Sequence, residues 1–217
     1  MTPLFLTLKV AFLATACTMV LGVTAAYALT RTRFWGRALA EVLFSLPLVL
    51  PPTVLGYYLL VLIGRNGLIG HWLFDTFGIS LIFTWQGAVL AAMVVSLPLV
   101  FKSAGAAFAA VNHQCEEAAA TLGAHRIVIF FRVSLPLAWR GILAGGMLAF
   151  ARAMGEFGAT LMVAGNLPGR TQTLSMAVYD AVQAGNFQQA NLLVLIITLV
   201  SGIILYGSGK LFQSEWR

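Results

Sequence analysis

Long apolar segments without charged residues recur along the chain, and shorter charged segments separate them. A helix needs about 20 predominantly apolar residues to cross the hydrocarbon core of a bilayer. Five segments reach that length: residues 8–29, the window between Glu41 and Arg65, and residues 81–101, 138–164 and 191–209. The pattern therefore predicts an all-α integral membrane protein in which about five transmembrane helices form one domain over residues 1–217.

Two of these segments contain prolines, which would break a helix in a soluble protein. The second segment carries three of them: Pro47, Pro51 and Pro52. In a membrane, neighbouring helices and local adjustments satisfy the carbonyl groups that proline leaves free. We therefore expect the second segment to form one span, and the third to kink near Pro98. Residues 64–80 are rich in glycine and polar side chains and predict a loop with a helical turn at 71–77.

Two segments admit more than one interpretation. The first ends in Ala26-Tyr27-Ala28, which mimics the cleavage site of a secretory signal peptide. Its apolar run exceeds the usual length of about 7–15 residues, and basic residues follow it rather than precede it, so we interpret it as a span. Residues 172–189 could form a surface helix, a re-entrant segment or a sixth crossing. Their polar side chains disfavour lipid contact, and we expect five spans; these side chains are Asp180, Gln183, Asn186, Gln188 and Gln189.

The composition excludes two broad classes of protein. Of the 217 residues, 60% are hydrophobic and 9% are charged, with a mean hydropathy of +0.91. Soluble domains are about 45–50% apolar and about 25% charged, and disordered chains combine low hydrophobicity with high charge. The two cysteines, Cys17 and Cys115, and the three histidines are not spaced as metal ligands. We therefore expect no disulfide framework, no metal and no cofactor.

The excess of basic residues bears on orientation. A net charge of +6 and a pI of about 9.8 would suggest nucleic acid in a soluble protein, but in a membrane protein Lys and Arg mark the cytoplasmic loops. We therefore expect no nucleic-acid partner. Most basic residues lie in segments 30–37 and 102–140 and in the C-terminal tail, whereas Lys9, Arg65 and Arg170 fall on the opposite side. Five spans then place the N-terminus outside and the C-terminus in the cytoplasm.

The fourth predicted span contains two charged residues, Arg152 and Glu156. They are four residues apart, so on one helix they share a face and can pair. Charged residues within a span face the bundle interior or a water-filled path. Two hypotheses remain open: a structural ion pair that serves as a strut of a gate, and a cationic group on an anion path. We include Gly158 and Thr160, which follow on the same segment, in the candidate path or gate.

The longest polar stretch, residues 102–140, contains an Ala-rich segment at 104–120 that predicts a helix. Glu117 places a negative charge at the start of that helix, where the helix dipole favours it. Gly123 can adopt a positive φ and end the helix in a tight turn, and Pro136 redirects the chain as it re-enters the bilayer. We predict a short, stiff cytoplasmic helix held between two spans; the alternative is a plain Ala-rich surface helix.

One segment of this polar stretch resembles the EAA signature of the permeases of bacterial ABC importers. The signature is Glu-Ala-Ala, three residues, Gly, nine residues, an aliphatic residue, any residue and Leu-Pro. A start at Glu116 would shift Gly123 and Pro136 by one, so the register begins one residue later. Val133 stands where the family usually has Ile. The resemblance implies that residues 102–137 form a coupling loop that docks on a separate ATPase subunit.

The resemblance also assigns the residues that couple to the ATPase, which are Glu117, Ala118, Ala119, Gly123, Leu135 and Pro136. The chain has no Gly-x-x-x-x-Gly-Lys-Ser/Thr phosphate loop of its own. We therefore expect a partner subunit to hydrolyse ATP.

Three further runs are similar to the permeases of molybdate, sulfate and tungstate importers: Ser45–Tyr57, Gly155–Thr160 and Ala164–Leu174. This resemblance implies a helical bundle that dimerises around a central pathway in the bacterial inner membrane. It further implies two cytoplasmic ATP-binding cassette subunits and an external, periplasmic oxyanion-binding protein. That protein would dock near the residues of an external loop, which are Asn166, Pro168, Gly169 and Arg170.

We thus expect an oxyanion permease, with molybdate favoured by the residues flanking these runs. Tungstate and sulfate or thiosulfate are the alternatives within transport. A membrane enzyme would need a nucleophile, a base or a metal cluster facing one cavity, and only Arg152 and Glu156 are candidates, so we expect no enzymatic activity. A membrane scaffold without a transport role is disfavoured by the spacing of the EAA signature.

Overall fold

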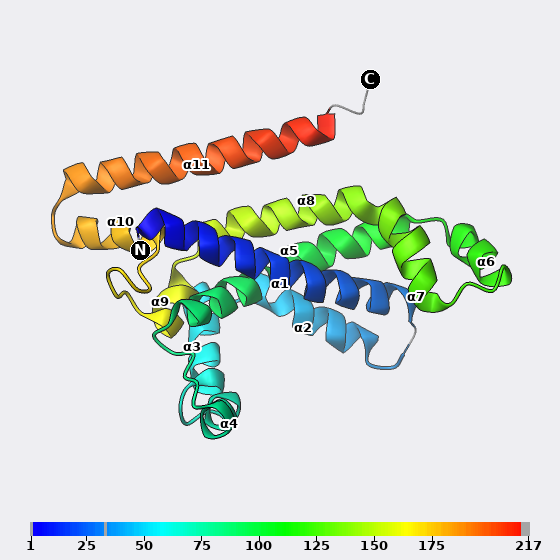
Figure 1. Cartoon of the computed structure of the whole chain (residues 1–217), viewed down its shortest axis with the longest axis horizontal. Helices are drawn as coiled ribbons and strands as arrows, with labels where there is room; N and C mark the ends of the chain where they lie inside the picture. The colour runs from blue at the N-terminus through cyan, green and yellow to red at the C-terminus, as the bar shows by residue number, and fades with distance from the viewer. Residues whose placement is uncertain (1, 33, 214–217) are drawn as a thin grey trace.

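The computed structural model describes residues 2–32 and 34–213, with side chains as far as Ile204 and at Tyr206. Within that range the chain is helical and contains no strand, as the sequence predicts (Figure 1). The elements are α1 (Pro3–Arg31), α2 (Arg37–Val49), α3 (Pro52–Ile63), α4 (Leu68–Phe77), α5 (Trp85–Ala110), α6 (His113–Thr121), α7 (Arg126–Ile129), the π-helical turn η1 (Phe130–Ser134), α8 (Leu135–Met154), α9 (Gly158–Ala164), α10 (Leu174–Gln183) and α11 (Phe187–Gln213).

Three long helices, α1, α5 and α8, form the centre of the fold and pack against one another. Small residues make the closest of these contacts, because they let helix backbones approach each other in a membrane. A Cβ atom on Gly145 would lie 2.7 Å from the Cβ of Ser103, and one on Gly141 would lie 2.6 Å from the Cβ of Ala107. These two glycines, one turn apart, seat α8 directly on α5.

Four helical stretches are long and apolar enough to cross a membrane: Pro3–Arg31, Trp85–Ala110, Arg126–Met154 and Phe187–Ile204. The pair formed by α2 and α3 passes the same test together but is bent by 118°. The described residues therefore give five spans when the bent pair counts as one. The ten residues of α10 are too few for a crossing of about 20 residues, so the segment 172–189 does not supply a sixth.

The predicted second span is present as two helices with a sharp break between them. Helix α2 ends at Val49, and α3 begins at Pro52. Leu50 and Pro51 between them are extended, with ψ of 139° and 138°. A proline disfavours the helical conformation of the residue before it, so two consecutive prolines impose two extended residues. The chain turns sharply at this point.

The fourth span also differs from the predicted residues 138–164. It runs from α7 through η1 to the end of α8 as a helix of 29 residues. Pro136 lies inside this helix, directly after the π turn in which the Leu135 N–H donates to the Phe130 carbonyl. The wider turn accommodates the carbonyl groups that proline cannot pair. The prediction that Pro136 redirects the chain at the bilayer is therefore wrong. The helix continues through Pro136 and ends at Met154.

The other predicted elements are present with different bounds. The Ala-rich segment 104–120 forms two helices, because α5 ends at Ala110 and the Asn112 side chain caps the start of α6 by accepting from the Gln114 N–H at 3.0 Å. The first, third and last spans and the short helix predicted at 71–77 are observed as α1, α5, α11 and α4.

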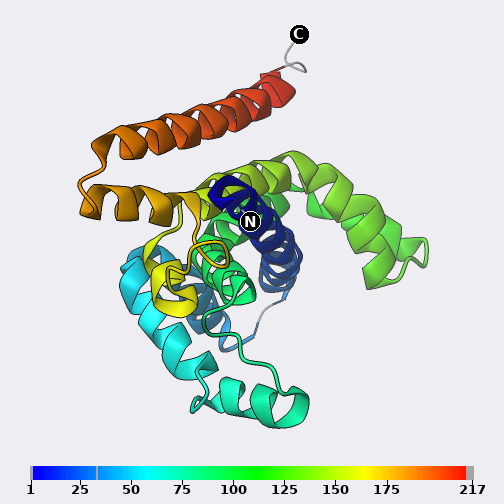
Figure 2. The same cartoon turned by 60° about the vertical axis from the view of Figure 1, so that its left-hand side comes forward.

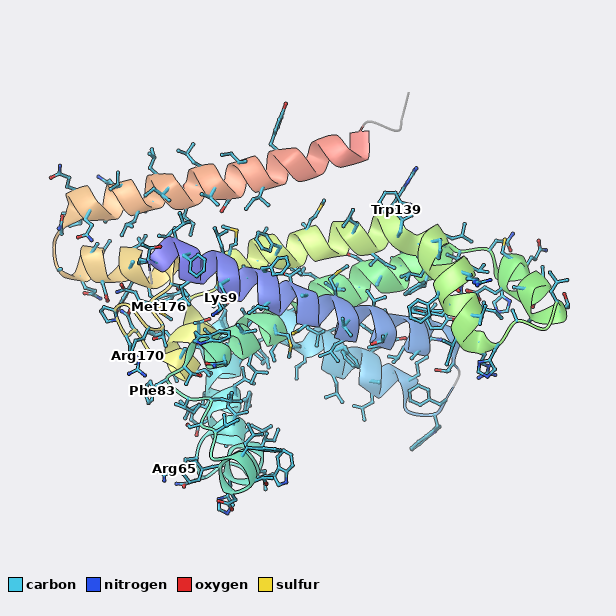
Figure 3. The ribbon with its side chains drawn as sticks, in the orientation of Figure 1. Lys9, Arg65, Phe83, Trp139, Arg170 and Met176 are labelled. Atoms are coloured by element: carbon cyan, nitrogen blue, oxygen red, sulfur yellow. The ribbon has the colours of Figure 1, made fainter. Side chains whose placement is uncertain are left out.

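Helix α11 follows α10 along the outside of the bundle (Figures 1 and 2), and it touches the central helices through α8 and through Val200 and Ile204. Only 6% of its apolar window is buried, so most of its surface is open to lipid or to another protein. Figure 3 places Lys9 and Arg170 near the end of the bundle that is opposite α6. Arg33 and residues 214–217, which belong to the predicted basic segments, lie outside the described residues.

Candidate functional site

Helix α6 lies at one end of the molecule, between the end of α5 and the start of α7 (Figure 1). It ends as predicted at Gly123, whose φ is +84°. The Gly123 N–H donates to the Ala120 carbonyl at 3.0 Å, and the Ala124 N–H donates to the Ala119 carbonyl at 3.1 Å. This pair of bonds is the Schellman arrangement, which satisfies the last carbonyls of a helix and needs a left-handed residue.

The structure corrects the position predicted for Glu117. Helix α6 begins at His113, so Glu117 is its fifth residue rather than its first. The Glu117 carboxylate is exposed and lies 3.1 Å from the Nδ1 of His113. Ala118 and Leu122 are exposed on the same short helix and its end. The candidate coupling residues Glu117, Ala118, Ala119 and Gly123 are thus brought together, whereas Leu135 and Pro136 lie on α8, beyond η1.

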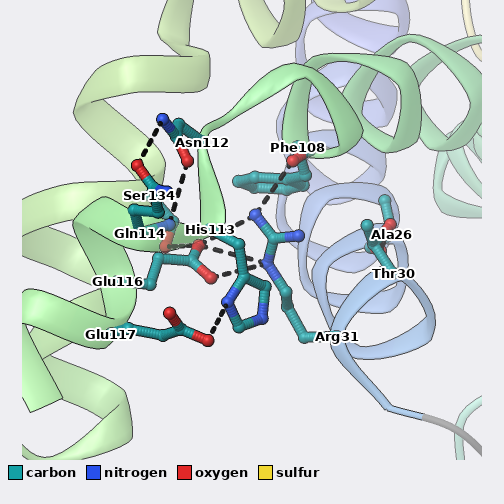
Figure 4. A network of polar contacts seen from close by, with 10 residues as sticks. All are labelled: Ala26, Thr30, Arg31, Phe108, Asn112, His113, Gln114, Glu116, Glu117 and Ser134. Carbon is teal, nitrogen blue, oxygen red and sulfur yellow. Dashed lines mark hydrogen bonds and ion pairs between the residues drawn. The ribbon is translucent and has the colours of Figure 1, made fainter.

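The adjacent residue, Glu116, was not a candidate from the sequence. Its carboxylate is buried and accepts hydrogen bonds from Arg31 and from the Ser134 hydroxyl, the latter at 2.6 Å (Figure 4). The EAA signature begins at Glu117, so Glu116 falls outside the motif. No local pattern in the sequence marks Glu116, because its partner Arg31 lies 85 residues away along the chain.

A second candidate centre lies where the two helix breaks approach each other, the break between α2 and α3 and the break between α8 and α9. Helix α9 packs on both α3 and α5. A Cβ atom on Gly56 of α3 would lie 2.9 Å from the Cα of Ala159. A Cβ atom on Gly158 would lie 3.1 Å from the Cβ of Pro52. Glycines on both sides therefore hold the two breaks close together.

The predicted ion pair of Arg152 and Glu156 forms, with Nη1 and Oε2 2.7 Å apart. The expectation that both lie on one helix is wrong, because α8 ends at Met154 and Glu156 lies in the break. The Glu156 side chain is 2% exposed and that of Arg152 is 35% exposed. Glu156 Oε1 also accepts from the Ala159 N–H at 2.8 Å. The carboxylate therefore fixes both the arginine and the first turn of α9.

Of the four candidate path residues, Arg152 lines a hollow. The hollow has a volume of about 160 Å³ and is bordered by Pro47 of α2, Pro52 at the start of α3, and Val95 and Leu99 of α5. Gly158 serves the contact of α9 with α3 described above. Thr160 is buried on α9, away from this lining. The arrangement presents one partly exposed cation beside an apolar wall.

The predicted external residues lie in the loop between α9 and α10. The Asp180 carboxylate organises this loop, because it accepts from the Asn166 amide at 2.6 Å and from the Gln172 amide at 2.7 Å. Pro168, Gly169 and Arg170 are exposed at its tip, and Gly169 has a φ of +75°. The sequence identified Asp180 only as a polar residue and did not reveal its role as the anchor of this loop.

Comparison with known sequences decides the family. Residues 18–217 match the family described as the binding-protein-dependent transport system inner membrane component. The chain belongs to this family. It is a multi-pass inner-membrane protein of the permease type, and the predicted resemblance to importer permeases is confirmed.

Three curated relatives cover nearly the whole chain. The molybdenum transport system permease protein ModB of Escherichia coli K12 is 44% identical over 211 residues, which are 97% of this chain and 90% of the relative. The putative molybdenum transport system permease protein YvgM of Bacillus subtilis 168 is 43% identical over 208 residues, 94% of this chain and 90% of the relative. The sulfate transport system permease protein CysT of Escherichia coli K12 is 36% identical over 205 residues, 94% of this chain and 74% of the relative.

Solved structures share the fold at lower identity. The inward-facing MetNI methionine ABC transporter matches with a TM-score of 0.73 and 17% identity, over 99% of this chain and 95% of that chain. A bacterial ABC transporter for the import of alginate matches with a TM-score of 0.74 and 16% identity, over 99% of this chain and 79% of that chain. The all-α architecture of the permease is therefore that of ABC transporter membrane subunits.

The pair of Arg152 and Glu156 gives a stability prediction. Arg152→Gln leaves the buried Glu156 carboxylate without its partner and is expected to cost about 3–5 kcal/mol of unfolding free energy. Glu156→Gln leaves Arg152, which is 35% exposed and partly hydrated, and is expected to cost less, about 1–3 kcal/mol. The double substitution is expected to cost less than the sum of the two. Unfolding of the purified permease in detergent, followed by circular dichroism, measures these differences.

The control for this experiment is Glu41→Gln. The Arg37–Glu41 pair has the same spacing along the chain, but both side chains are 41% exposed, so its loss should cost under about 1 kcal/mol. Exchange of Arg152 and Glu156 should not restore stability, because arginine has no acceptor for the Ala159 N–H. Equal stability of Glu156→Gln and Glu41→Gln would contradict a structural role of the buried pair.

Proposed function

We propose that the chain is the membrane-spanning permease subunit of an ATP-driven ABC importer for molybdate. The observation that carries this proposal is the identity of 44% and 43% to molybdenum permeases over nearly the whole chain, against 36% to a sulfate permease. Tungstate and sulfate or thiosulfate are the alternative substrates. The permease carries no catalytic group for ATP hydrolysis in this proposal, and two ATP-binding cassette subunits in the cytoplasm supply the energy.

Helix α6 serves as the coupling helix that meets an ATPase subunit. It projects from the end of the bundle (Figure 1) and exposes Ala118 and Leu122, a small and an apolar side chain suited to a groove. The helix that follows, Arg126–Met154, has 29 residues and at about 1.5 Å per residue extends about 43 Å. Its far end lies one residue before the break that holds Glu156. A displacement at α6 can therefore reach the second centre through one helix.

The hollow beside Arg152 lies on the oxyanion pathway in this proposal. A dianion cannot cross an apolar bundle without compensating charge. The Arg152 side chain lines the hollow and is partly exposed, while the buried Glu156 holds it in place. Two copies of the chain would present two such cations to a shared path, which supports a homodimer. In this proposal the ion pair has two roles: it fixes the break between α8 and α9, and it places the Arg152 cation beside the anion path.

The external binding protein docks on the loop at Pro168, Gly169 and Arg170, which Asp180 anchors. In this orientation the coupling loop, residues 102–137, and the C-terminus are cytoplasmic and the N-terminus is outside. The whole chain acts as a single transmembrane domain.

The substrate proposal predicts ATP-dependent uptake of molybdate. Proteoliposomes that contain the permease with its ATPase and its oxyanion-binding protein should accumulate molybdate, measured by mass spectrometry of molybdenum. Tungstate should compete because of its similar size and charge, and sulfate should compete weakly. Preferential uptake of sulfate, with no molybdate uptake, would contradict the substrate assignment.

The same assay separates the two roles of Arg152. The double substitution Arg152→Gln/Glu156→Gln removes both charges and leaves no unpaired one. If the pair is only a strut, an assembled complex with this variant should transport normally. If Arg152 contributes to the anion path, uptake should be lost while the complex and its ATPase activity remain.

The coupling assignment predicts that Gly123→Val disrupts the interface with the ATPase. The φ of +84° at this position is unfavourable for a β-branched residue, so the end of α6 must rearrange. The variant should insert into the membrane but lose co-purification with the ATPase, measured by affinity capture. Gly105→Val on α5 is the control, because no atom lies within 4 Å of a Cβ built there. Normal co-purification and uptake by Gly123→Val would refute the assignment.

The orientation predicts which positions an impermeant thiol reagent reaches in intact cells. In a chain in which both cysteines, Cys17 and Cys115, are replaced, Arg170→Cys should be labelled from outside and Arg126→Cys should not. Labelling of both after membrane disruption is the control for reactivity. Labelling of Arg126→Cys in intact cells would overturn the orientation together with the cytoplasmic position of α6.

A further inference from the structure

Glu116 connects the coupling helix to three other parts of the bundle. Arg31, the last residue of α1, donates to the Glu116 carboxylate from Nε and from Nη2, at 3.1 and 2.9 Å from Oε1. The Ser134 hydroxyl, at the end of η1, donates to Oε1 at 2.6 Å. Arg31 Nη2 also donates to the Phe108 carbonyl at 3.0 Å. Figure 4 shows these bonds converging on the one carboxylate and its arginine.

Arg31 adds a second donor to a carbonyl at the end of α5. Phe108 lies in the last turn of α5, and its carbonyl accepts from the Val111 N–H at 3.2 Å as well as from Arg31. A cation at a helix C-terminus is also favoured by the helix dipole, and Arg31 lies at the end of both α1 and α5. The pair with Glu116 is charge-assisted and uses two nitrogens of the guanidinium, which fixes its geometry.

Burial distinguishes this pair from the other charged pairs at the same end. The side chains of Arg31 and Glu116 are 17% and 9% exposed, whereas Arg37 and Glu41 are both 41% exposed. Exposed pairs contribute little because water screens them. A buried pair resists separation, since breaking it leaves an uncompensated charge. The Arg31–Glu116 pair therefore holds α6 to the end of α1 more strongly than an exposed ion pair would.

We propose that Arg31, Glu116 and Ser134 form a joint that transmits movement between the coupling helix and the central helices. The proposal rests on the proposed function as an importer permease. Helix α6 itself packs against α7 and η1, and only two residues, Val111 and Asn112, link it to α5. The Glu116 carboxylate ties this helix to α1 through Arg31, to α5 through the Phe108 carbonyl, and to the start of α8 through Ser134.

These three are positioning residues, because they touch neither the substrate nor ATP. Their role is to make the bundle follow α6 when the ATPase moves it. Without the joint, α6 can still dock on the ATPase subunit. Its displacement then bends the short loops before and after α6 and does not move the central helices. The expected defect is therefore loss of coupling in an assembled complex.

The test compares ATP hydrolysis with and without molybdate-loaded binding protein, in nanodiscs that contain the permease and its ATPase. Glu116→Gln and Arg31→Gln should keep assembly and basal hydrolysis, while stimulation by the loaded binding protein and molybdate uptake fall about fivefold or more. Arg31→Lys keeps the positive charge but cannot donate to Glu116 from two nitrogens of one planar group, so it should retain part of the stimulation. Glu41→Gln, in the exposed pair, is the matched control and should behave as the unmodified complex.

Several outcomes decide the matter. Unchanged stimulation per assembled complex in Glu116→Gln and Arg31→Gln, with only the yield reduced, would show a static structural role and overturn the joint. If neither variant assembles, Ser134→Ala decides, because it removes one hydrogen bond and leaves the ion pair: reduced stimulation supports the joint and normal stimulation overturns it. Absence of stimulation in the unmodified complex would instead overturn the proposed function, and with it the role given to the joint.

Discussion

Backbone groups released at a helix break must find partners inside the protein, because lipid offers none. This constraint governs the centre of the permease. The chain breaks before α3 and again before α9, and α9 packs against α3 next to both breaks. In the first turn of α9, the Ala159 N–H donates a hydrogen bond to the Glu156 carboxylate. That carboxylate is buried and carries a charge, so it in turn requires Arg152. One backbone requirement thus leads to the charged pair.

The close fit around the breaks follows from the same constraint. If α3 and α9 stood apart, water or lipid would reach the interrupted backbone. Gly56 and Gly158 remove the side chains that would hold the two helices apart, as small residues do in membrane bundles. The glycines of α8 act similarly toward α5. Packing and polar satisfaction are therefore coupled, since the close contacts bury the very groups that need internal partners.

Local features of this structure could be predicted from the sequence, and features that depend on distant residues could not. The end of α6 at Gly123 was predictable because the positive φ is a local requirement of a helix terminus. The four prolines within apolar segments show the limit. Pro47 and Pro98 remain inside helices, whereas Pro51 and Pro52 together end one. From the sequence, all four prolines were expected to lie within spans. Only the consecutive pair, Pro51 and Pro52, interrupts the helix.

The role of Glu116 was beyond reach of the sequence for a related reason. Its partner Arg31 is 85 residues away along the chain, and no spacing rule connects them. The Arg152–Glu156 pairing was predicted from a spacing of four, although the helix that justified that spacing ends before Glu156. The pair forms because the break keeps the two side chains near each other. A correct contact was therefore predicted from a wrong local structure.

The two polar centres are built on one principle and joined by one element. In each, a buried glutamate bonds an arginine, and the pair also engages the end of a helix: the C-terminus of α5 at Phe108 in one, the N-terminus of α9 at Ala159 in the other. Ser134 and Arg152 lie 18 positions apart on the same continuous helix, about 27 Å at its rise per residue. A continuous helix tends to move as one body, because each backbone N–H is bonded to a carbonyl one turn earlier and so ties successive turns together. In the proposed coupling, a rotation or shift at the first centre is carried along this helix to the second, where the helix ends at Met154.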